Sequence, residues 1–263
     1  MTKIKFENPP ITELVIGVYF ERDLPSLRVE HAGLFWSEIR DEFPTVSQHP
    51  VVSPSPPGGQ FPTGDEFVFE PFPMPRFWFE AADGISLMQV QKNAFIFNWR
   101  KRDADYPHFE TVKSSFDKYF GMFIEFLLRE GNAMPSARIL ELTYVNTLQQ
   151  SEYWTSLRDT NRVIPLFHLP IQEDADAAPS DFHQLSVQRL APDLSLHTTV
   201  RSTRSTKDAT KPSLVFELRA IGLLDDAMKR DVDQWFDRAH DTIGTCFLSM
   251  TSPDIQRRYW KPV

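Results

Sequence analysis

The segment 76–101 constrains the fold more than any other part of the chain. Three stretches in it alternate apolar and polar residues, and the pairs Asp83-Gly84 and Lys92-Asn93 separate them. A period of two is typical of β-strands with one buried face, and such pairs favour tight hairpin turns. The sequence therefore predicts an antiparallel meander of three strands, at residues 76–80, 85–91 and 94–101.

Two-residue turns fix how these strands pair. The predicted neighbours are Phe77 with Val90, Phe79 with Met88, Val90 with Phe95, and Met88 with Phe97. A slip of one residue would move the apolar set to the other face, so the pattern itself sets the register. One face is then apolar, and the other carries Trp78, Glu80, Gln89, Gln91, Asn98 and Arg100.

The rest of the chain is divided by the same criteria. Alternation predicts a strand at 11–20 after Asn8-Pro9-Pro10, and apolar spacings of three and four predict helices at 26–43 and 109–129. The proline-rich stretch 45–64 predicts an exposed loop, followed by a short strand at 66–70. The remaining predictions are strands at 139–148, 182–190, 194–204 and 213–221, a short helical segment at 152–158 and a long helix at 228–250.

Each half of the chain thus follows a similar plan of strand, helix, antiparallel strands and helix. We expect an α+β protein of two similar modules, residues 1–132 and 133–263, packed as one unit with helices on one face of antiparallel sheet.

Composition excludes several classes of protein. The 263 residues include 22 Phe and 21 Pro but only 10 Gly, and the formal net charge is −8. The acidic balance argues against bulk binding to nucleic acid. No apolar run is long enough to span a membrane, no signal peptide is recognisable, and one cysteine, Cys246, excludes an internal disulfide. We expect a cytoplasmic protein that does not act at a membrane.

The polar face of the meander is the first candidate site. Trp78, Glu80, Gln89, Gln91, Asn98 and Arg100 project from adjacent strands, where an arginine and amides could hold a ligand or partner. The alternative is a solvated or module-facing sheet surface on which Arg100 pairs with Glu80 or another carboxylate.

Other candidates have simpler explanations. His240-Asp241 and Cys246 fall on one predicted helix beside core residues, which favours structural roles over a metal site or a nucleophile. The basic run with Arg201, Arg204 and Lys207 could contact phosphates, but a solvated loop is the default interpretation. No motif implies a cofactor, a metal or a catalytic residue, so we expect none.

Several short strings resemble one protein family. They are Asn8-Pro9-Pro10-Ile11 with Glu13, Gln89-Val90-Gln91, Asn98-Trp99-Arg100-Lys101, Tyr106-Pro107, Glu141 to Asn146, and the stretch from Trp235 through His240-Asp241 to Phe247. Together they resemble a sporadically distributed, uncharacterised family of bacterial and archaeal proteins. The resemblance implies no activity or cofactor, and the patchy distribution is compatible with an accessory role in defence or toxin control.

These observations favour non-catalytic recognition of a protein or small-molecule partner. Two alternatives stay open: a hydrolase or nuclease with a site between the modules, and nucleic-acid binding through the loop 201–211. An edge strand could also pair across a homodimer.

Overall fold

The computed structural model describes residues 5–53, 74–167, 181–205, 208, 210–224 and 232–263. Within these residues nine strands form one antiparallel sheet in the order β2-β3-β4-β5-β1-β6-β9-β8-β7, and five helices pack against it. The predicted α+β class with antiparallel sheet is confirmed. The two halves of the chain share a continuous sheet, because β1 (Ile11–Phe20) pairs with β5 (Ala94–Arg100) on one side and β6 (Ala137–Gln149) on the other.

The predicted meander is confirmed in its register. β3 (Arg76–Glu80), β4 (Ser86–Gln91) and β5 pair so that Phe77 faces Val90, Phe79 faces Met88, and Met88 faces Phe97. The first turn places Gly84 at a φ of 66°, which a residue without a Cβ adopts at little cost.

The last strands also follow the predicted plan. β7 (His183–Ala191) and β8 (Leu194–Arg204) form a hairpin around Pro192-Asp193, and β9 (Pro212–Leu223) joins β8 to β6. β7 therefore forms one edge of the sheet, and β2 (Thr45–His49) forms the other.

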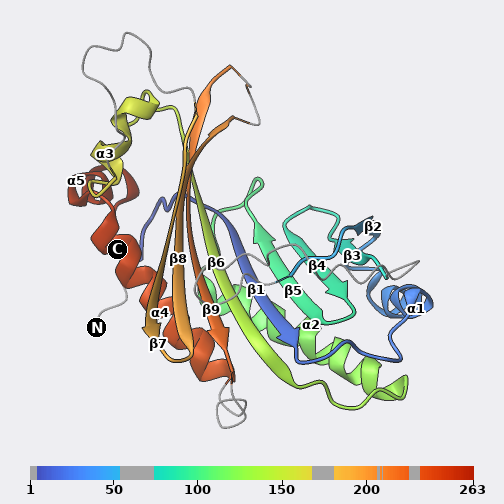
Figure 1. The fold of residues 1–263 in the computed structure, drawn as a ribbon. Helices are drawn as coiled ribbons and strands as arrows, with labels where there is room; N and C mark the ends of the chain where they lie inside the picture. The colour runs from blue at the N-terminus through green and yellow to red at the C-terminus, as the bar shows by residue number, and fades with distance from the viewer. Residues whose placement is uncertain (1–4, 54–73, 168–180, 206–207, 209, 225–231) are drawn as a thin grey trace.

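Helices cover one face of the sheet (Figure 1). The long helices are α1 (Val29–Ile39), α2 (Phe109–Arg129) and α4 (Val232–Met250), and the short ones are α3 (Thr160–Val163) and α5 (Pro253–Ile255). A π-helical turn, Gln256–Trp260, follows α5. The Phe35 and Phe123 rings link α1 to α2 at 5.4 Å, and the Phe116 and Phe236 rings link α2 to α4 at 5.7 Å.

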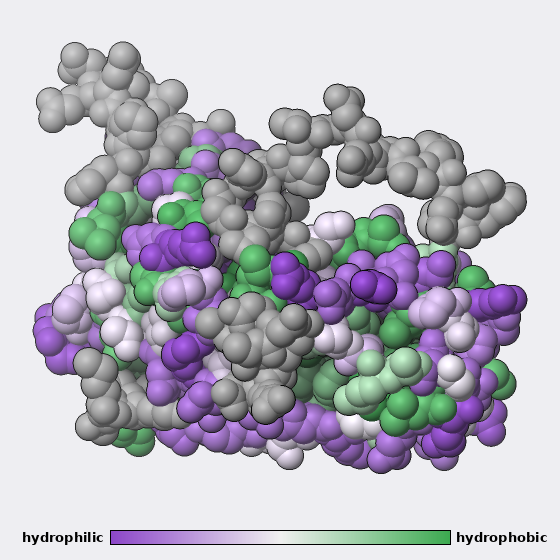
Figure 2. Space-filling view, turned by 60° about the horizontal axis from the view of Figure 1, so that its bottom comes forward, coloured by the Kyte–Doolittle hydropathy of each residue, from purple (hydrophilic) through white to green (hydrophobic). Residues whose placement is uncertain are grey.

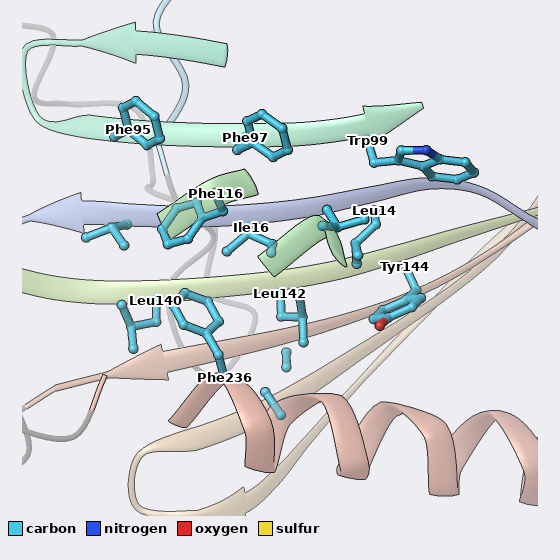
Figure 3. Packing of buried hydrophobic residues seen from close by; sticks show 14 of the residues in the cluster. Leu14, Ile16, Phe95, Phe97, Trp99, Phe116, Leu140, Leu142, Tyr144 and Phe236 are labelled. Atoms are coloured by element: carbon cyan, nitrogen blue, oxygen red, sulfur yellow. The ribbon is translucent and has the colours of Figure 1, made fainter. Parts of the chain in front are cut away.

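One apolar core lies between the helices and the strands from β3 to β8. Leu14 and Ile16 of β1 point to the same side as Phe95 and Phe97 of β5 and as Leu140 and Leu142 of β6, toward Phe116 and Phe236 (Figure 3). Alternation along each strand produces this arrangement, since every second side chain faces the helices. On the face in Figure 2, hydrophilic residues cover most of the described surface and hydrophobic ones form small separate groups.

Some sequence predictions are wrong. Residues 45–49, assigned to a loop, form β2, because a five-residue strand before Pro50 needs only the edge of β3 as a partner. The helix predicted from Ser26 to Phe43 is shorter at both ends: its N-cap is Arg28 and its last residue is Ile39. The short helical segment predicted at 152–158 lies at 157–163. The strand predicted at 66–70 and the first residues of the last helix lie outside the described residues, as does most of the proline-rich stretch.

Candidate functional site

A pocket of about 360 Å³ lies on the helix side of the sheet. Its walls come from four places: the N-terminal segment 5–11, the residues that lead into α2, the central strands β6 and β9, and α4. Seven aromatic rings of described residues line it: Phe6, Tyr106, His108, Phe109, Tyr144, His240 and Phe247. Its volume lies within the range of sites that bind small organic molecules.

A chain of hydrogen bonds crosses the inner wall of this pocket. The hydroxyls of Tyr106 and Tyr144 are 3.2 Å apart, and the Tyr144 hydroxyl lies 2.8 Å from Nδ1 of His240. The imidazole of His240 also stacks on the Phe109 ring, with centroids 4.2 Å apart and planes 8° from parallel. These contacts give an otherwise apolar wall a short polar strip.

Local sequence explains why these side chains converge. Tyr144 follows Leu140 and Leu142 at intervals of two along β6, so it faces the helices, as Figure 3 shows. Tyr106 precedes α2 and packs edge-on against Trp99 at 5.2 Å. His240 lies on the side of α4 that carries Phe236 and Ile243 to the core.

Burial keeps both tyrosines protonated. Desolvation raises the pKa of Tyr144 well above its ordinary value, and the neighbouring Tyr106 and Glu110 raise it further. Desolvation also raises the pKa of Tyr106. A chain of neutral hydroxyls that ends on an imidazole can be polarised in either direction, because either ring nitrogen can carry the proton. At its Tyr106 end the chain can thus offer a ligand a donor or an acceptor.

Charged side chains stand around the pocket. Among the described residues the lining holds one ammonium group, Lys5, and two carboxylates, Glu110 and Asp241. This balance disfavours a ligand with a net negative charge.

Gly244 leaves part of the pocket open. It lies in the interior of α4, and a Cβ built on it would have no neighbouring atom within 4 Å. Glycine costs about 1 kcal/mol relative to alanine in such a position. No close packing in the described structure requires this glycine, and its effect is to keep space free beside Phe247 and Leu248.

The backbone is strained at the mouth of the pocket. His108, the N-cap residue of α2, has φ 71° and ψ 160°, a region that is essentially restricted to glycine. Its ring meets the Tyr106 ring edge-on at 5.9 Å. Strain of this kind costs about 1–3 kcal/mol and is frequent where a site holds a ligand.

The N-terminal segment is held in place by the end of the chain. Glu7 N and Asn8 N donate to the carbonyls of Lys261 and Trp260 at 2.9 and 3.0 Å, and Thr147 N donates to the carbonyl of Pro10 at 3.0 Å. The wall formed by Phe6, Pro9 and Pro10 is therefore fixed to the C-terminal residues and to β6.

The residues predicted from the meander lie on the opposite face of the sheet. Gln89, Gln91 and Asn98 are buried there, and Gln89 Nε2 donates to Asn98 Oδ1 at 2.6 Å. Asn98 Nδ2 donates to Glu13 at 2.7 Å, and Gln89 accepts from Arg76 at 2.8 Å, so one bonded chain crosses four strands. The structure thus brings Gln89 and Asn98 together, as predicted. Their amide groups bond to each other, to Arg76 and to Glu13.

The other predicted members of that face make no hydrogen bond to this chain among the described contacts, although the Arg76 guanidinium lies 5.4 Å from the centroid of the Trp78 ring. Arg100 Nη2 lies 2.9 Å from Glu80 Oε1, which is the ion pair that the alternative interpretation expected. Gln91 bonds to the backbone of Val52 and to Asn93. Trp78 stacks on His49 at 3.9 Å, and its Nε1 has no acceptor in the described part of the chain. That this face binds a partner stays a prediction.

A second buried polar cluster, on the same face, was not predicted. Glu141 accepts from Tyr19 at 2.9 Å, from Arg219 at 2.8 Å and from Thr143 at 3.0 Å. The Tyr19 ring lies over Gly17, which has no side chain to obstruct it. The cluster links β1, β6 and β9 at the centre of the sheet, where the two halves of the chain meet.

The remaining sequence candidates give no second site. Arg201 and Arg204 lie on β8, while Lys207 lies outside the described residues, so nucleic-acid binding there stays a prediction. His240 pairs with Tyr144, and Cys246 is half-buried with its pKa raised by desolvation. Among the described residues no three His, Cys, Asp or Glu side chains are arranged to hold a metal. None of the described helices has the length and apolar character needed to cross a bilayer.

Comparisons with known proteins do not identify the chain. It matches no model of a known protein family, and no curated protein is significantly similar to it. The resemblance inferred from the sequence strings therefore stays a prediction.

Some of the strings behind that resemblance contribute residues to the pocket, whereas the strings 89–91 and 98–101 belong to the meander. The contributing residues are Pro9, Pro10, Ile11, Tyr106, Tyr144, Asn146, His240, Asp241, Ile243, Gly244, Thr245 and Phe247. The sequence alone predicts no shared site for these residues. Tyr106, Tyr144 and His240 are polar aromatic residues within otherwise apolar patterns, and this is the signal that could have been followed.

Proposed function

We propose that this protein is a non-catalytic recognition module that binds a small organic molecule in the pocket between segment 5–11, α2, β6 and α4. One observation carries the proposal: an apolar cavity of about 360 Å³ whose inner wall holds the hydrogen-bonded chain Tyr106–Tyr144–His240. An apolar pocket with a few convergent polar groups is typical of sites for small ligands.

The walls favour a flat ligand. Rings of Phe109, Tyr144, His240 and Phe247 offer faces and edges against which a planar group packs well. The excess of carboxylates favours a neutral or positively charged ligand over an acid. We therefore expect a heteroaromatic compound whose polar atom bonds to the Tyr106 end of the chain.

Binding explains these residues better than catalysis does. Both tyrosines keep their protons because burial raises the pKa of each, so neither provides an anionic base or nucleophile. The pocket does join residues of 1–132 to residues of 133–263, which is where the hydrolase or nuclease alternative would place its site. That alternative requires an activated nucleophile or a metal in addition to the groups described.

Strand order supports the proposal of two modules. In each half the first strand lies beside the last strand of its own meander: β1 beside β5, and β6 beside β9. A helix follows in both halves, α2 and α4, and these two helices flank the pocket. On this proposal the ligand sits at the joint between the modules 1–132 and 133–263.

Ligand-observed NMR tests the proposed function. The probes are quinoline, 2-aminoquinoline and quinoline-2-carboxylate, which share one ring system and differ in charge. We expect binding of the first two, weaker binding of the acid, and loss of binding in Gly244→Leu, which fills the pocket. Gly121→Leu is the matched control, because Gly121 also has open space around its Cβ position but lies on α2 outside the pocket lining. Equal binding by Gly244→Leu and the wild type would refute the assignment.

A further inference from the structure

Among the residues that the structure describes, β7 pairs with β8 alone and forms one edge of the sheet. Side chains on both of its faces are exposed: Gln184, Ser186 and Gln188 on the helix side, and His183, Leu185 and Arg189 on the other. The nearest long helix, α4, packs on β6 and β9, two strands further in. The exposure of these side chains shows that the described helices leave both faces of β7 uncovered.

The pairing with β8 shows which backbone groups point outward. Ser202 N donates to the carbonyl of Phe182 at 3.0 Å, so residue 182 is hydrogen-bonded toward β8. The backbone N–H and C=O groups of successive residues point to opposite sides of a strand. Those of His183, Leu185, Val187 and Arg189 therefore point away from β8. Proteins usually protect such an edge with proline, lysine or inward-pointing charges, and residues 183–190 contain neither proline nor lysine.

The sequence of this edge has a two-fold pattern. Around Ser186, Leu185 is matched by Val187 and Gln184 by Gln188. Further out, the basic His183 is matched by Arg189 and the apolar Phe182 by Leu190. An antiparallel copy of the same strand, centred on Ser186, would therefore place aliphatic opposite aliphatic and amide opposite amide.

We propose that two copies of the chain pair antiparallel through β7, with the two-fold axis at Ser186. In this register Leu185 of each copy lies opposite Val187 of the other, and each such pair exchanges two backbone hydrogen bonds. The aliphatic pairs cover side chains that are exposed in one chain, such as Leu185 at 41%. The two pairs of basic residues, Arg189 with His183, fall at the ends of the paired segment. A symmetric interface closes on itself and leaves β7 with no free edge.

Cysteine cross-linking tests the axis. Ser186 is directed toward β8, so Ser186 of the two copies forms a non-hydrogen-bonded pair with Cα atoms about 4.5 Å apart, within disulfide range. In a Cys246→Ser background the chain has one introduced thiol, and Ser186→Cys should give a covalent dimer under mild oxidation. Gln184→Cys in the same background is the control, because residue 184 of one copy faces residue 188 of the other. Cross-linking of Gln184→Cys but not Ser186→Cys would overturn the proposed register.

Light scattering on the full chain tests the interface itself. The wild type should have twice the chain mass of 30.5 kDa at micromolar concentration. Val187→Pro should halve the mass, because proline removes an outward N–H and no hydrogen bond to β8. Val187→Thr keeps the donor and should stay dimeric. A monomeric wild type that forms no Ser186→Cys cross-link, or a dimer that persists in folded Val187→Pro, would overturn the proposal. A monomeric wild type would instead favour an extended peptide of another protein as the partner of the β7 edge.

Discussion

Substitutions of Gly244 should affect ligand binding and the stability of the fold differently. Gly244 lies in the interior of α4, and a Cβ there meets nothing within 4 Å. Substitution therefore carries no clash, and alanine should raise the free energy of unfolding by about 1 kcal/mol through helix propensity alone. For a chain of this length, that gain corresponds to a rise in Tm of about 2–4 °C.

Leucine at the same position should have two opposite effects. It keeps most of the gain in helix propensity, and it places an apolar side chain in the cavity that the ligand needs. We expect the Tm to rise while affinity for quinoline falls at least about tenfold, or 1.4 kcal/mol.

Urea denaturation and NMR titration of the wild type, Gly244→Ala and Gly244→Leu measure both quantities. Gly121→Ala on α2 is the control for propensity, since its Cβ position is also open. A lower free energy of unfolding in Gly244→Ala, together with the expected gain in Gly121→Ala, would show that α4 needs glycine for packing. The reasoning about the pocket would then be wrong.

Three further predictions concern strain, packing and buried charge. His108→Gly should raise the Tm by a few degrees, because glycine adopts φ 71° and ψ 160° without strain. The strain relieved is about 1–3 kcal/mol, and the larger backbone entropy of glycine in the unfolded state offsets about 0.5–1 kcal/mol of it. An unchanged or lower Tm in a thermal scan would contradict this prediction. Gly222→Ala should lower the free energy of unfolding in urea by about 1–3 kcal/mol, because its Cβ would lie 2.5 Å from the buried indole of Trp235. No loss of stability would mean that Trp235 moves aside freely. Desolvation raises the pKa of Glu217, so the folded state holds its proton more tightly than the unfolded state and loses stability as pH rises from 4.5 through the folded pKa. Glu217→Gln should therefore be more stable than the wild type at pH 7, with a difference that shrinks as the pH falls toward 4.5, and a difference that grows in acid would refute this sign.

Local pattern was enough to predict much of the fold. α2 begins and ends at the predicted residues, Phe109 and Arg129, because its apolar stripe keeps helical spacing throughout. The meander has the predicted register because each of its strands has one apolar face and a short turn. In both cases the information lies within about twenty-five residues of sequence.

Long-range pairing could not be predicted in the same way. β1 and β6 join the halves into one sheet, although Leu14 and its partner Tyr144 are 130 positions apart. Periodicity shows that a strand exists and does not show its neighbour. The number of sheets was therefore open until the structure placed β1 between β5 and β6.

The candidate site was missed for a related reason. Tyr106, Tyr144 and His240 lie in a loop, a strand and a helix, and each looks like an ordinary core residue within its own element. The polar face of the meander was easier to find because its residues are neighbours in one hairpin. Burial and mutual hydrogen bonds of Gln89 and Asn98 depend on strand geometry, which residue types alone do not show.

The central claim is that a flat molecule occupies the pocket beside His240, and the imidazole signals of His240 test it most directly. These signals can be followed in ¹H–¹³C NMR spectra during addition of 2-aminoquinoline, with His240→Gln to assign them among the seven histidines. The account predicts a saturable shift of the His240 signals in the wild type and in Gly121→Leu, and no shift in Gly244→Leu. If the probe binds while the His240 signals stay unchanged, or if Gly244→Leu shifts as the wild type does, the claim is contradicted.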